Sequence, residues 1–409
     1  MNLLYIDPGT GSMIFSVFLG LAAAAYFLFR TFLIKVKVLF LGKNKALQSK
    51  SAFVIYNEAN HYWPVFKPIT DEFEKRGIDV QYLTSSETDP VFINDYKYVH
   101  PVFIGADNKA FASLNFIEAD VCLMTTPGLE VYQLKRSKLC KHYAHILHEP
   151  GDAIFYKLFG IDWFDSIFLS GEYQKKDIRK LEKLRCLPEK ELIVTGSTYL
   201  DYYNNKLKNY SENDHVFTVL VSPSWGTAAL LSVMGDSLLE SLKNTEWRVI
   251  VRPHPQSKKS EVQILKPLEE KFTSFIWDYN SENTESLSKA DIMISDFSGV
   301  IFDYAFLFNK PILYHKASLN KNIYDAGDIE DEPWKFIAVK HFGREITEND
   351  LPNIKEIIQQ VIADSSLTSE IQKAKDTAWQ NRGKSGITAV DALVSIRNNI
   401  LETSSKETT

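Results

Sequence analysis

Short apolar runs alternate with longer segments of helical spacing along most of this chain. In the first half, six runs with β-strand character are closed by turn residues, at positions 52–56, 78–83, 121–125, 143–147, 166–169 and 192–195. A segment of helical spacing at 65–76, which ends before Gly77, separates the first two. Strands that alternate with helices predict an α/β domain with a parallel sheet.

A second series follows a polar segment, 200–215, which has little apolar periodicity and is interpreted as the link between domains. Its expected strands lie at 216–221, 247–251, 275–277, 292–294 and 312–314. Terminal helices are expected at 354–364 and 370–400, and residues 401–409 are expected to form a polar tail without regular structure. The predicted parts are therefore residues 1–50, a first α/β domain at 51–210, a second at 211–345, and the C-terminal helices and tail at 346–409.

The N-terminal segment differs in kind from these domains. Residues 13–29 carry no charge, and the basic residues Arg30, Lys35, Lys37, Lys43, Lys45 and Lys50 follow them. A secretory signal would carry its positive charge before the apolar run instead. We expect a single N-terminal transmembrane helix, extended at both ends to reach about 20 residues. The positive-inside rule then places both α/β domains in the cytoplasm, at the cell membrane. A buried core helix is the alternative.

Composition narrows the class of protein further. The 409 residues are 45% hydrophobic and 13% aromatic, which is typical of chains with packed cores and excludes wholesale disorder. A net charge of −6 argues against a dedicated nucleic-acid-binding protein. The three cysteines, Cys122, Cys140 and Cys186, form neither a zinc-binding pattern nor a disulfide framework, which fits a reducing compartment.

The segment 290–315 has the most informative pattern in the chain. A short apolar strand ends at Ser295 and Asp296, a turn ends in Ser298-Gly299, and residues 300–308 then read as a buried helix before Pro311 and the next strand. The free N–H groups and the positive end of the helix dipole suit a bound phosphate. Asp303 is the only charge on this helix, so it either caps a group or holds a ligand.

The sequence Arg252-Pro253-His254-Pro255 directly follows the predicted strand 247–251. Proline on both sides of His254 restricts the backbone and removes two amide donors, so the imidazole is presented on a stiff loop. A stiff loop suits a group that holds an anionic oxygen without reorganising. A structural loop histidine beside a structural arginine is the alternative interpretation.

Three histidines, His142, His145 and His148, are spaced by three residues in and after the strand 143–147. On a strand, His142 and His148 share one face and His145 lies on the other, so no metal site is expected. His148 lies where the strand must stop, before Glu149-Pro150, and a histidine at such an edge can serve as a general base. For His142 and His145, ordinary packing or solvent exposure is favoured.

Small hydroxyl residues follow the first strand of the second series, in the sequence Ser222-Pro223-Ser224-Trp225-Gly226-Thr227. Such a loop can let the backbone approach a phosphate or a ribose, although an ordinary turn explains it equally well. Neither the dinucleotide fingerprint nor the phosphate-binding P-loop occurs in this loop. Residues 57–61 and 125–128, which follow strands of the first series, are candidates for an acceptor-binding face.

Two of these motifs together resemble a known family. The pair R-P-H-P and, some forty residues later, S-D-F-S-G-V-I-F-D-Y-A-F-L-F-N-K-P-I-L-Y is similar to the CDP-glycerol glycerophosphotransferase family of teichoic-acid-type polymer synthesis. The resemblance covers roughly residues 143–314. It implies two Rossmann-like domains in a GT-B arrangement, with the acceptor on the first domain and the donor nucleotide held mainly by the second.

The resemblance also implies roles for individual residues. His148 and His254 would be catalytic, with His148 as the base, and His254 would face the donor diphosphate. Arg252, Ser298 and Gly299 would bind the donor, and Asp303 would bind a hydroxyl of the donor or the acceptor. Apart from the resemblance, Ser222, Ser224 and Asp296, which follow predicted strands of the second series, are further candidate donor-binding residues. The histidine that corresponds to His148 usually stands in H-G-T in this family, whereas Glu149-Pro150 follows it here.

The predicted function is transfer of glycerol phosphate, or a related polyol phosphate, from a CDP-activated donor to a hydroxyl of a membrane-linked glycan or polymer, with release of CMP. No cofactor, metal or nucleic acid is expected. The predicted partners are CDP-glycerol or a related CDP-polyol, a lipid-linked or glycan acceptor, and the membrane. The alternatives are a sugar-nucleotide glycosyltransferase or epimerase of GT-B fold, and a catalytically silent binding protein with the same fold.

Overall fold

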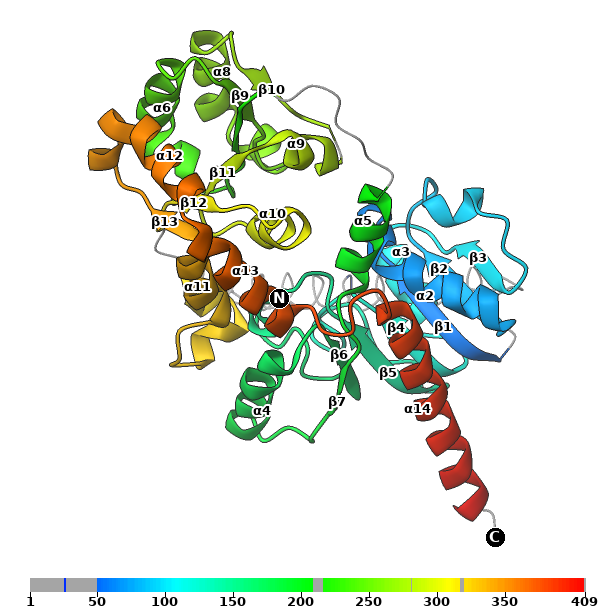
Figure 1. Cartoon of the computed structure of the whole chain (residues 1–409). Coiled ribbons are helices and arrows are strands. Elements are labelled where there is room, and N and C mark those ends of the chain that lie inside the picture. The colour runs from blue at the N-terminus through cyan, green and yellow to red at the C-terminus, as the bar shows by residue number, and fades with distance from the viewer. Residues whose placement is uncertain (1–25, 27–49, 209–215, 281, 317–319, 408–409) are drawn as a thin grey trace, which may run out of the picture.

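Two parallel β-sheets, one in each domain, form the framework of the protein (Figure 1). The computed structural model describes residues 50–208, 216–280, 282–316 and 320–407, together with Tyr26. The first sheet has the order β3-β2-β1-β4-β5-β6-β7, with β1 at Ser51–Asn57, β2 at Val80–Thr84, β3 at Val99–Phe103, β4 at Ala119–Met124, β5 at Cys140–Ile146, β6 at Ser166–Leu169 and β7 at Glu191–Val194. The second has the order β10-β9-β8-β11-β12-β13, with β8 at Thr218–Val221, β9 at Arg248–Val251, β10 at Ile276–Trp277, β11 at Ile292–Ser295, β12 at Ile312–Tyr314 and β13 at Gly343–Glu345.

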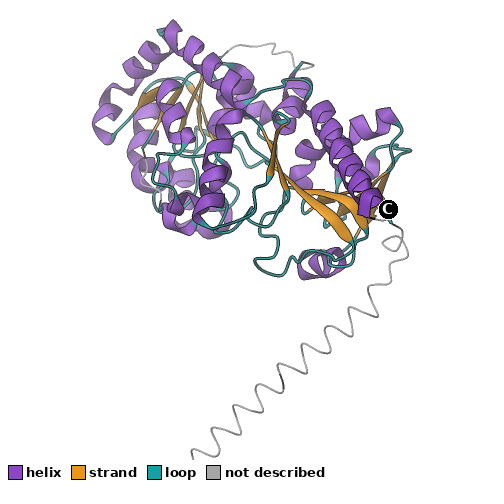
Figure 2. Cartoon of the chain, turned by 90° about the horizontal axis from the view of Figure 1, so that it is seen from below, coloured by secondary structure: helices purple, strands orange, loops and turns teal. Residues whose placement is uncertain are grey.

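Helices surround both sheets, which occupy separate halves of the molecule (Figure 2). Those that follow strands of the first sheet are α2 (Trp63–Arg76), α3 (Asp107–Leu114), α4 (Lys175–Leu184) and α5 (Thr198–Leu207). The second domain adds α6 (Leu230–Lys243), α7 (Ser257–Ser260), α8 (Val262–Lys271), α9 (Thr284–Lys289), α10 (Val300–Phe308) and α11 (Trp334–Ala338). The chain ends in α12 (Ile354–Ala363), α13 (Ser365–Ala378) and α14 (Ser385–Glu407).

All strand pairs within the two sheets are parallel, as the alternation of strands and helices predicted. Central strands of such sheets are covered on both faces, and they therefore read as continuous apolar runs. In β4 every residue is buried, and in β8 and β11 likewise. This double burial explains why the sequence shows short apolar runs instead of alternation.

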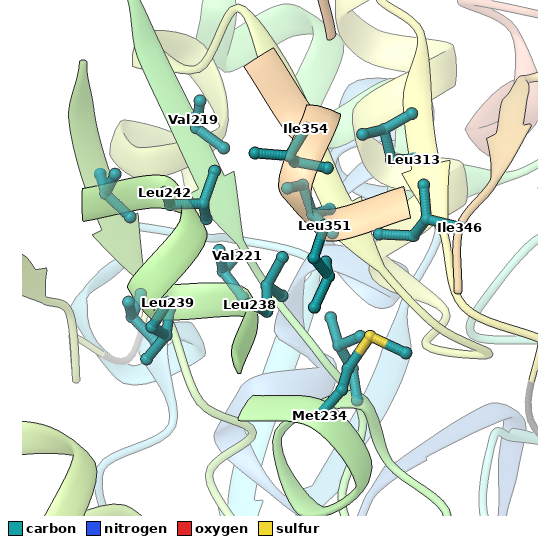
Figure 3. Close-up of a cluster of buried hydrophobic side chains, with 14 of the residues drawn as sticks. Val219, Val221, Met234, Leu238, Leu239, Leu242, Leu313, Ile346, Leu351 and Ile354 are labelled. Carbon is teal, nitrogen blue, oxygen red and sulfur yellow. The ribbon is translucent and has the colours of Figure 1, made fainter. Parts of the chain in front are cut away.

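The core of the second domain forms where α6 and the segment before α12 cover one face of the sheet (Figure 3). Val219 and Val221 project from β8 toward Leu238 and Leu242 of α6. Burial of side chains of this size stabilises the fold by roughly 1.5–3 kcal/mol each. This core fixes β8, whose carboxyl end forms part of the site described below.

The C-terminal segment returns from the second domain to the first, where α14 packs against α2 (Figure 1). The two helices approach closely at Gly386. A Cβ atom at this position would lie only 2.3 Å from the Pro68 carbonyl oxygen. Only glycine allows this contact. The last helix therefore stabilises the first domain, although it follows the second in sequence.

The predicted strands are found with small shifts at their ends, but two strands escaped prediction. Both are edge strands. β3 contains Pro101, which has no N–H for a sheet ladder, and β13 has the polar sequence Gly343-Arg344-Glu345. Edge strands bury less surface, so their sequences carry a weaker apolar signal.

Three expectations about helices were wrong. The helix expected at 370–400 is interrupted at residues 379–384, between α13 and α14. The first part of the supposed link 200–215 is helical, since α5 extends to Leu207, and the Ser197 hydroxyl caps it by accepting a hydrogen bond from Leu200 N at 3.2 Å. The supposed tail continues α14 as far as Glu407. Its hydroxyl residues bond to carbonyls four residues earlier, as in Thr403 to Asn399, so they are accommodated within the helix.

The predicted transmembrane segment, residues 13–29, lies outside the described residues except for Tyr26. None of the helices in the described part of the chain is long and apolar enough to span a lipid bilayer.

Candidate active site

A cavity of about 350 Å³ lies between the two domains, at the carboxyl ends of their strands. In each sheet the strand order reverses next to the first strand, since β1 has β2 and β4 as neighbours and β8 has β9 and β11. Ligands of open α/β sheets bind at this reversal point. The cavity is lined by His61, Tyr62, Val65, His148, Glu149, Tyr199, Tyr203, Ser222, Pro223, Arg252, Pro253, His254, Pro255, Asn283, Ser298, Gly299, Val300 and Asp303.

Seven of the nine predicted site residues line this cavity, namely His148, Ser222, Arg252, His254, Ser298, Gly299 and Asp303. Ser224 and Asp296 do not. The Asp296 carboxylate is buried and accepts hydrogen bonds from the backbone N–H groups of Ser224, Leu230 and Ser298, at 2.9, 2.9 and 3.1 Å. Asp296 therefore joins the turn after β8 to the turn after β11, and it holds both in place beside the cavity.

The start of α10 points its backbone donors toward the cavity. Gly299 is the N-cap residue, and Ser298, Gly299 and Val300 all line the cavity wall. The first N–H groups of a helix have no partner within the helix, and the dipole adds partial positive charge there. Apart from Asp303, the remainder of α10 is largely apolar and packs in the second-domain core, which fixes the direction of this helix end.

Asp303 lies one turn into α10 and is only 8% exposed. Its Oδ2 accepts a hydrogen bond of 2.9 Å from the hydroxyl of Tyr199, which projects from α5. Burial raises the pKa of the Asp303 carboxyl to about 7, an effect that the Tyr199 hydrogen bond opposes and the nearby Glu149 charge reinforces. At neutral pH this carboxyl is therefore poised between an acceptor and a donor of hydrogen bonds.

Asp303→Asn is expected to flatten the pH dependence of stability between about pH 4 and pH 7. The folded-state pKa of about 7 lies above the ordinary value of 3.8, so the folded protein holds a proton that the unfolded chain releases in this window. The contribution of this carboxyl to the free energy of unfolding therefore falls as the pH rises, by on the order of 4 kcal/mol in full. Denaturant titrations of both proteins across this window measure the difference, and parallel curves would contradict it.

The loop after β9 presents His254 to the cavity with a defined tautomer. The backbone N–H of Gln256 donates to His254 Nδ1 at 3.1 Å, so Nδ1 is the acceptor and Nε2 carries the proton. Burial lowers the pKa of His254, against the opposing charge of Glu261, so the ring is neutral at pH 7. The indole of Trp225 lies roughly parallel to the imidazole, with ring centroids 6.3 Å apart. His254 thus offers the cavity one neutral N–H donor.

Arg252 lines the same wall, but its guanidinium is already engaged. Nη1 donates to the Asp278 carboxylate at 2.5 Å, and Nη2 donates to the Asn280 carbonyl at 2.7 Å. Both charged groups of this ion pair are largely buried. The pair fixes the position of the guanidinium and leaves only part of its charge available to a ligand.

His148 approaches from the first domain through a chain of hydrogen bonds. The hydroxyl of Tyr156 lies 3.1 Å from His148 Nδ1 and 3.1 Å from His145 Nε2. Because the phenol has one proton, it donates to one imidazole and accepts from the other. When His148 Nδ1–H donates to Tyr156, the Nε2 lone pair is left for the cavity. Burial lowers the pKa of His148 despite the opposing charge of Glu149, so the ring is neutral and can accept a proton.

The prediction that His148 shares a strand face with His142, opposite His145, was wrong. Strand β5 ends at Ile146, so the alternation of side chains does not extend to residue 148. His145 and His148 therefore meet at the same phenol instead of pointing apart. His142 bonds separately to the Ser166 hydroxyl at 2.9 Å, outside the cavity. His145 is completely buried, which agrees with a packing role.

Several cavity residues were not predicted. Tyr199 and Tyr203 come from α5, which the supposed link 200–215 overlaps from residue 200 onward, although their spacing of four places them on one face of a helix. His61 and Tyr62 follow β1, within or next to a loop that was expected to face the acceptor. Glu149 was noted only as a departure from the family motif. Within the described residues, no group of three or more His, Cys, Asp or Glu side chains is arranged to hold a metal ion.

Residues 227–381 match the sequence model of the CDP-glycerol:poly(glycerophosphate) glycerophosphotransferase family. Over 81 residues the chain is 32% identical to the minor teichoic acid biosynthesis protein GgaB of Bacillus subtilis (strain 168). This match covers 20% of the present chain and 8% of GgaB, so it concerns a small part of a much longer protein.

Solved structures with similar folds cover most of the chain. The wall teichoic acid polymerase TagF has a TM-score of 0.53 at 15% identity, over 91% of this chain and 98% of the compared chain. A UDP-GlcNAc 2-epimerase from Neisseria meningitidis has a TM-score of 0.55 at 16% identity, over 85% and 100%. At these identities the similarity shows the fold alone, and it confirms the predicted pair of GT-B-like parallel-sheet domains.

The family match covers α10 and the loop that carries His254 and Arg252, so it includes the second-domain wall of the cavity except Ser222 and Pro223. Together, the family model and GgaB show that this part of the chain is similar to glycerophosphotransferases of teichoic acid synthesis, and the solved structures add the fold. The resemblance seen in the two sequence motifs is thus confirmed, and this chain is similar to the CDP-glycerol glycerophosphotransferases through its second domain.

Proposed function

We propose that this protein transfers glycerol phosphate, or a related polyol phosphate, from a CDP-activated donor to a hydroxyl of a membrane-linked glycan or polymer, releasing CMP. The observation that carries the proposal is the meeting of His148, from the first domain, with His254 and the α10 start, from the second, in one cavity. A proton acceptor on one wall faces donors for phosphate oxygens on the other. Phosphoryl transfer to a hydroxyl requires both a base for the hydroxyl and hydrogen-bond donors for the phosphate oxygens.

In the proposed reaction the acceptor oxygen attacks the phosphorus that carries the polyol. The bond between that phosphorus and the oxygen of CMP breaks, and CMP leaves with the bonding electrons. His148 Nε2 takes the proton of the attacking hydroxyl, for which its lowered pKa keeps it in the neutral form. His254 Nε2–H and the first N–H groups of α10 donate to the phosphate oxygens, whose negative charge they stabilise without reorganising. Asp303 binds a hydroxyl of the donor or the acceptor.

The proposal includes attachment to the cytoplasmic face of the cell membrane. Its support is the uncharged segment 13–29 followed by basic residues. Fractionation of cells that produce the full-length chain, with and without residues 1–34, tests this part separately. Recovery of the full-length chain in the soluble fraction would contradict it.

The transferase activity is tested with the purified full-length chain, detergent-solubilised lipid-linked glycan, and CDP-glycerol, CDP-ribitol or UDP-GlcNAc in parallel. We expect release of CMP that depends on the acceptor, with one of the CDP-polyols as substrate. Release of UDP without any release of CMP would replace the proposal with a sugar-nucleotide enzyme. The same fold supports that alternative, since the similar epimerase structure was determined with UDP-GlcNAc bound. No nucleotide release and no nucleotide binding would favour a silent binding protein.

A further inference from the structure

Glu149 occupies an unusual place in the cavity. It follows His148 directly, and its loop is held by two side chains of the first domain: the Tyr173 hydroxyl donates to the Pro150 carbonyl at 2.6 Å, and Gln174 Nε2 donates to the Gly151 carbonyl at 2.5 Å. Pro150 restricts the backbone further. The loop therefore presents the Glu149 side chain to the cavity from a fixed position.

The Glu149 carboxylate lies against the start of α10, across the domain boundary. A Cβ atom on Gly299 would lie 2.5 Å from Glu149 Oε2, so the carboxylate fills the space that the missing side chain leaves at the N-cap. An anion in this position interacts favourably with the positive end of the helix. A carboxylate of the protein itself thus lies beside the N–H groups of α10. The proposed function assigns these N–H groups to the phosphates of the CDP-activated substrate.

The cations around the cavity offset this charge only in part. Arg252 is paired with Asp278, and Lys335, which interacts electrostatically with Glu149, is also shared with Asp152 and Asp296. Its ammonium lies over the Phe155 ring, 3.9 Å from the centroid. A diphosphate that enters beside an ionised Glu149 therefore meets a like charge at short range, in a partly desolvated site where charges are weakly screened.

We propose that the Glu149 carboxylate occupies the site of the donor phosphates in the free protein. A nucleoside diphosphate must displace this carboxylate in order to bind. This inference rests on the proposed function for the identity of the donor. Glu149 acts as a specificity-determining and positioning residue: it lowers the affinity for the anionic part of the donor and leaves binding of the nucleoside unchanged. A neutral residue in its place makes the cavity a tighter anion site.

Calorimetric titration with CDP, cytidine and inorganic pyrophosphate, in the presence of a metal chelator, tests this inference on the native chain and on Glu149→Gln. We expect the variant to bind CDP and pyrophosphate about tenfold or more tightly, with unchanged affinity for cytidine. Glu149→Gly, which introduces the glycine of H-G-T, is expected to act in the same direction. Glu282→Gln is the matched control, because its side chain is exposed beside the cavity residue Asn283 and pairs with Lys206. It should change none of the three affinities.

The outcomes separate this inference from the proposed function. Unchanged or weaker binding of both anions by folded Glu149→Gln and Glu149→Gly would overturn the inference. Tighter binding of pyrophosphate, with no binding of CDP by any of the proteins, would keep the role of Glu149 and reject the cytidine nucleotide as donor. Thermal unfolding of each variant establishes that the protein titrated is folded.

Discussion

His148→Ala is expected to lower kcat for CMP release by about 100- to 10 000-fold, the usual contribution of a general base. The His148 ring is the neutral imidazole that faces the cavity from the first domain, and its Nδ1 is bonded to Tyr156. In the tautomer in which Nδ1–H donates to Tyr156, Nε2 accepts the proton of the acceptor hydroxyl. Alanine removes the proton acceptor but leaves the phosphate-binding wall of the second domain intact. KM for the donor should therefore change little. Single-turnover measurement of CMP release separates the chemical step from product release.

His142→Gln provides a matched control for this variant. His142 lies six residues before His148, on β5, and it bonds to Ser166 outside the cavity, so its loss should leave kcat unchanged. Tyr156→Phe removes the hydroxyl that orients the His148 ring and is expected to reduce kcat by a smaller factor. If folded His148→Ala retains the native kcat, His148 is not the base. The Glu149-Pro150 departure from the family motif would then mark a change in mechanism.

Much of the site was predictable because its residues follow strands directly. In a parallel sheet all carboxyl ends lie on one edge, and β9 and β11 flank β8, so His254 and Ser298 line the same cavity. Their local sequences, prolines around one and a buried helix after the other, are visible without a structure. The prediction could not distinguish a residue that faces the cavity from one that supports it. Asp296 belongs to the same motif, yet its carboxylate is used by three backbone N–H groups.

The residues that escaped prediction depend on contacts between distant parts of the chain. The role of Tyr199 follows from its bond to Asp303, 104 residues later, and no local pattern encodes that pairing. The place of Glu149 depends on Gly299 in the other domain. Both residues lie where the two domains meet, and the relative placement of two domains is not contained in the periodicity of either one. The same reason applies to α14, which is far from α2 in sequence and packs on it in space.

The largest effect on stability is expected from Asp201→Ala, which should lower the free energy of unfolding by about 3–5 kcal/mol. Asp201 lies on α5 and is 3% exposed. One carboxylate oxygen accepts from the indole N–H of Trp379 at 2.9 Å and from Gly383 N at 2.8 Å. The other accepts from both the backbone N–H and the hydroxyl of Ser385. These groups belong to the segment that leads from α13 to α14.

Alanine at this position would leave four donors without their acceptor, and Trp379 and Ser385 are both buried. Each buried donor left unpaired costs roughly 1–3 kcal/mol, and relaxation of the segment recovers part of the total. Since α14 covers the first domain, we expect faster amide hydrogen exchange in α14 and α2, along with a lower thermal midpoint. Asp391→Ala is the matched control: Asp391 joins α14 to Arg76 of α2, but this pair lies at the surface and should contribute at most about 1 kcal/mol. Equal midpoints for the two variants would show that Asp201 does not anchor the C-terminal segment.

Because α5 also carries Tyr199, a loosened anchor should weaken donor binding as well, which titration with CDP can measure on the folded variant.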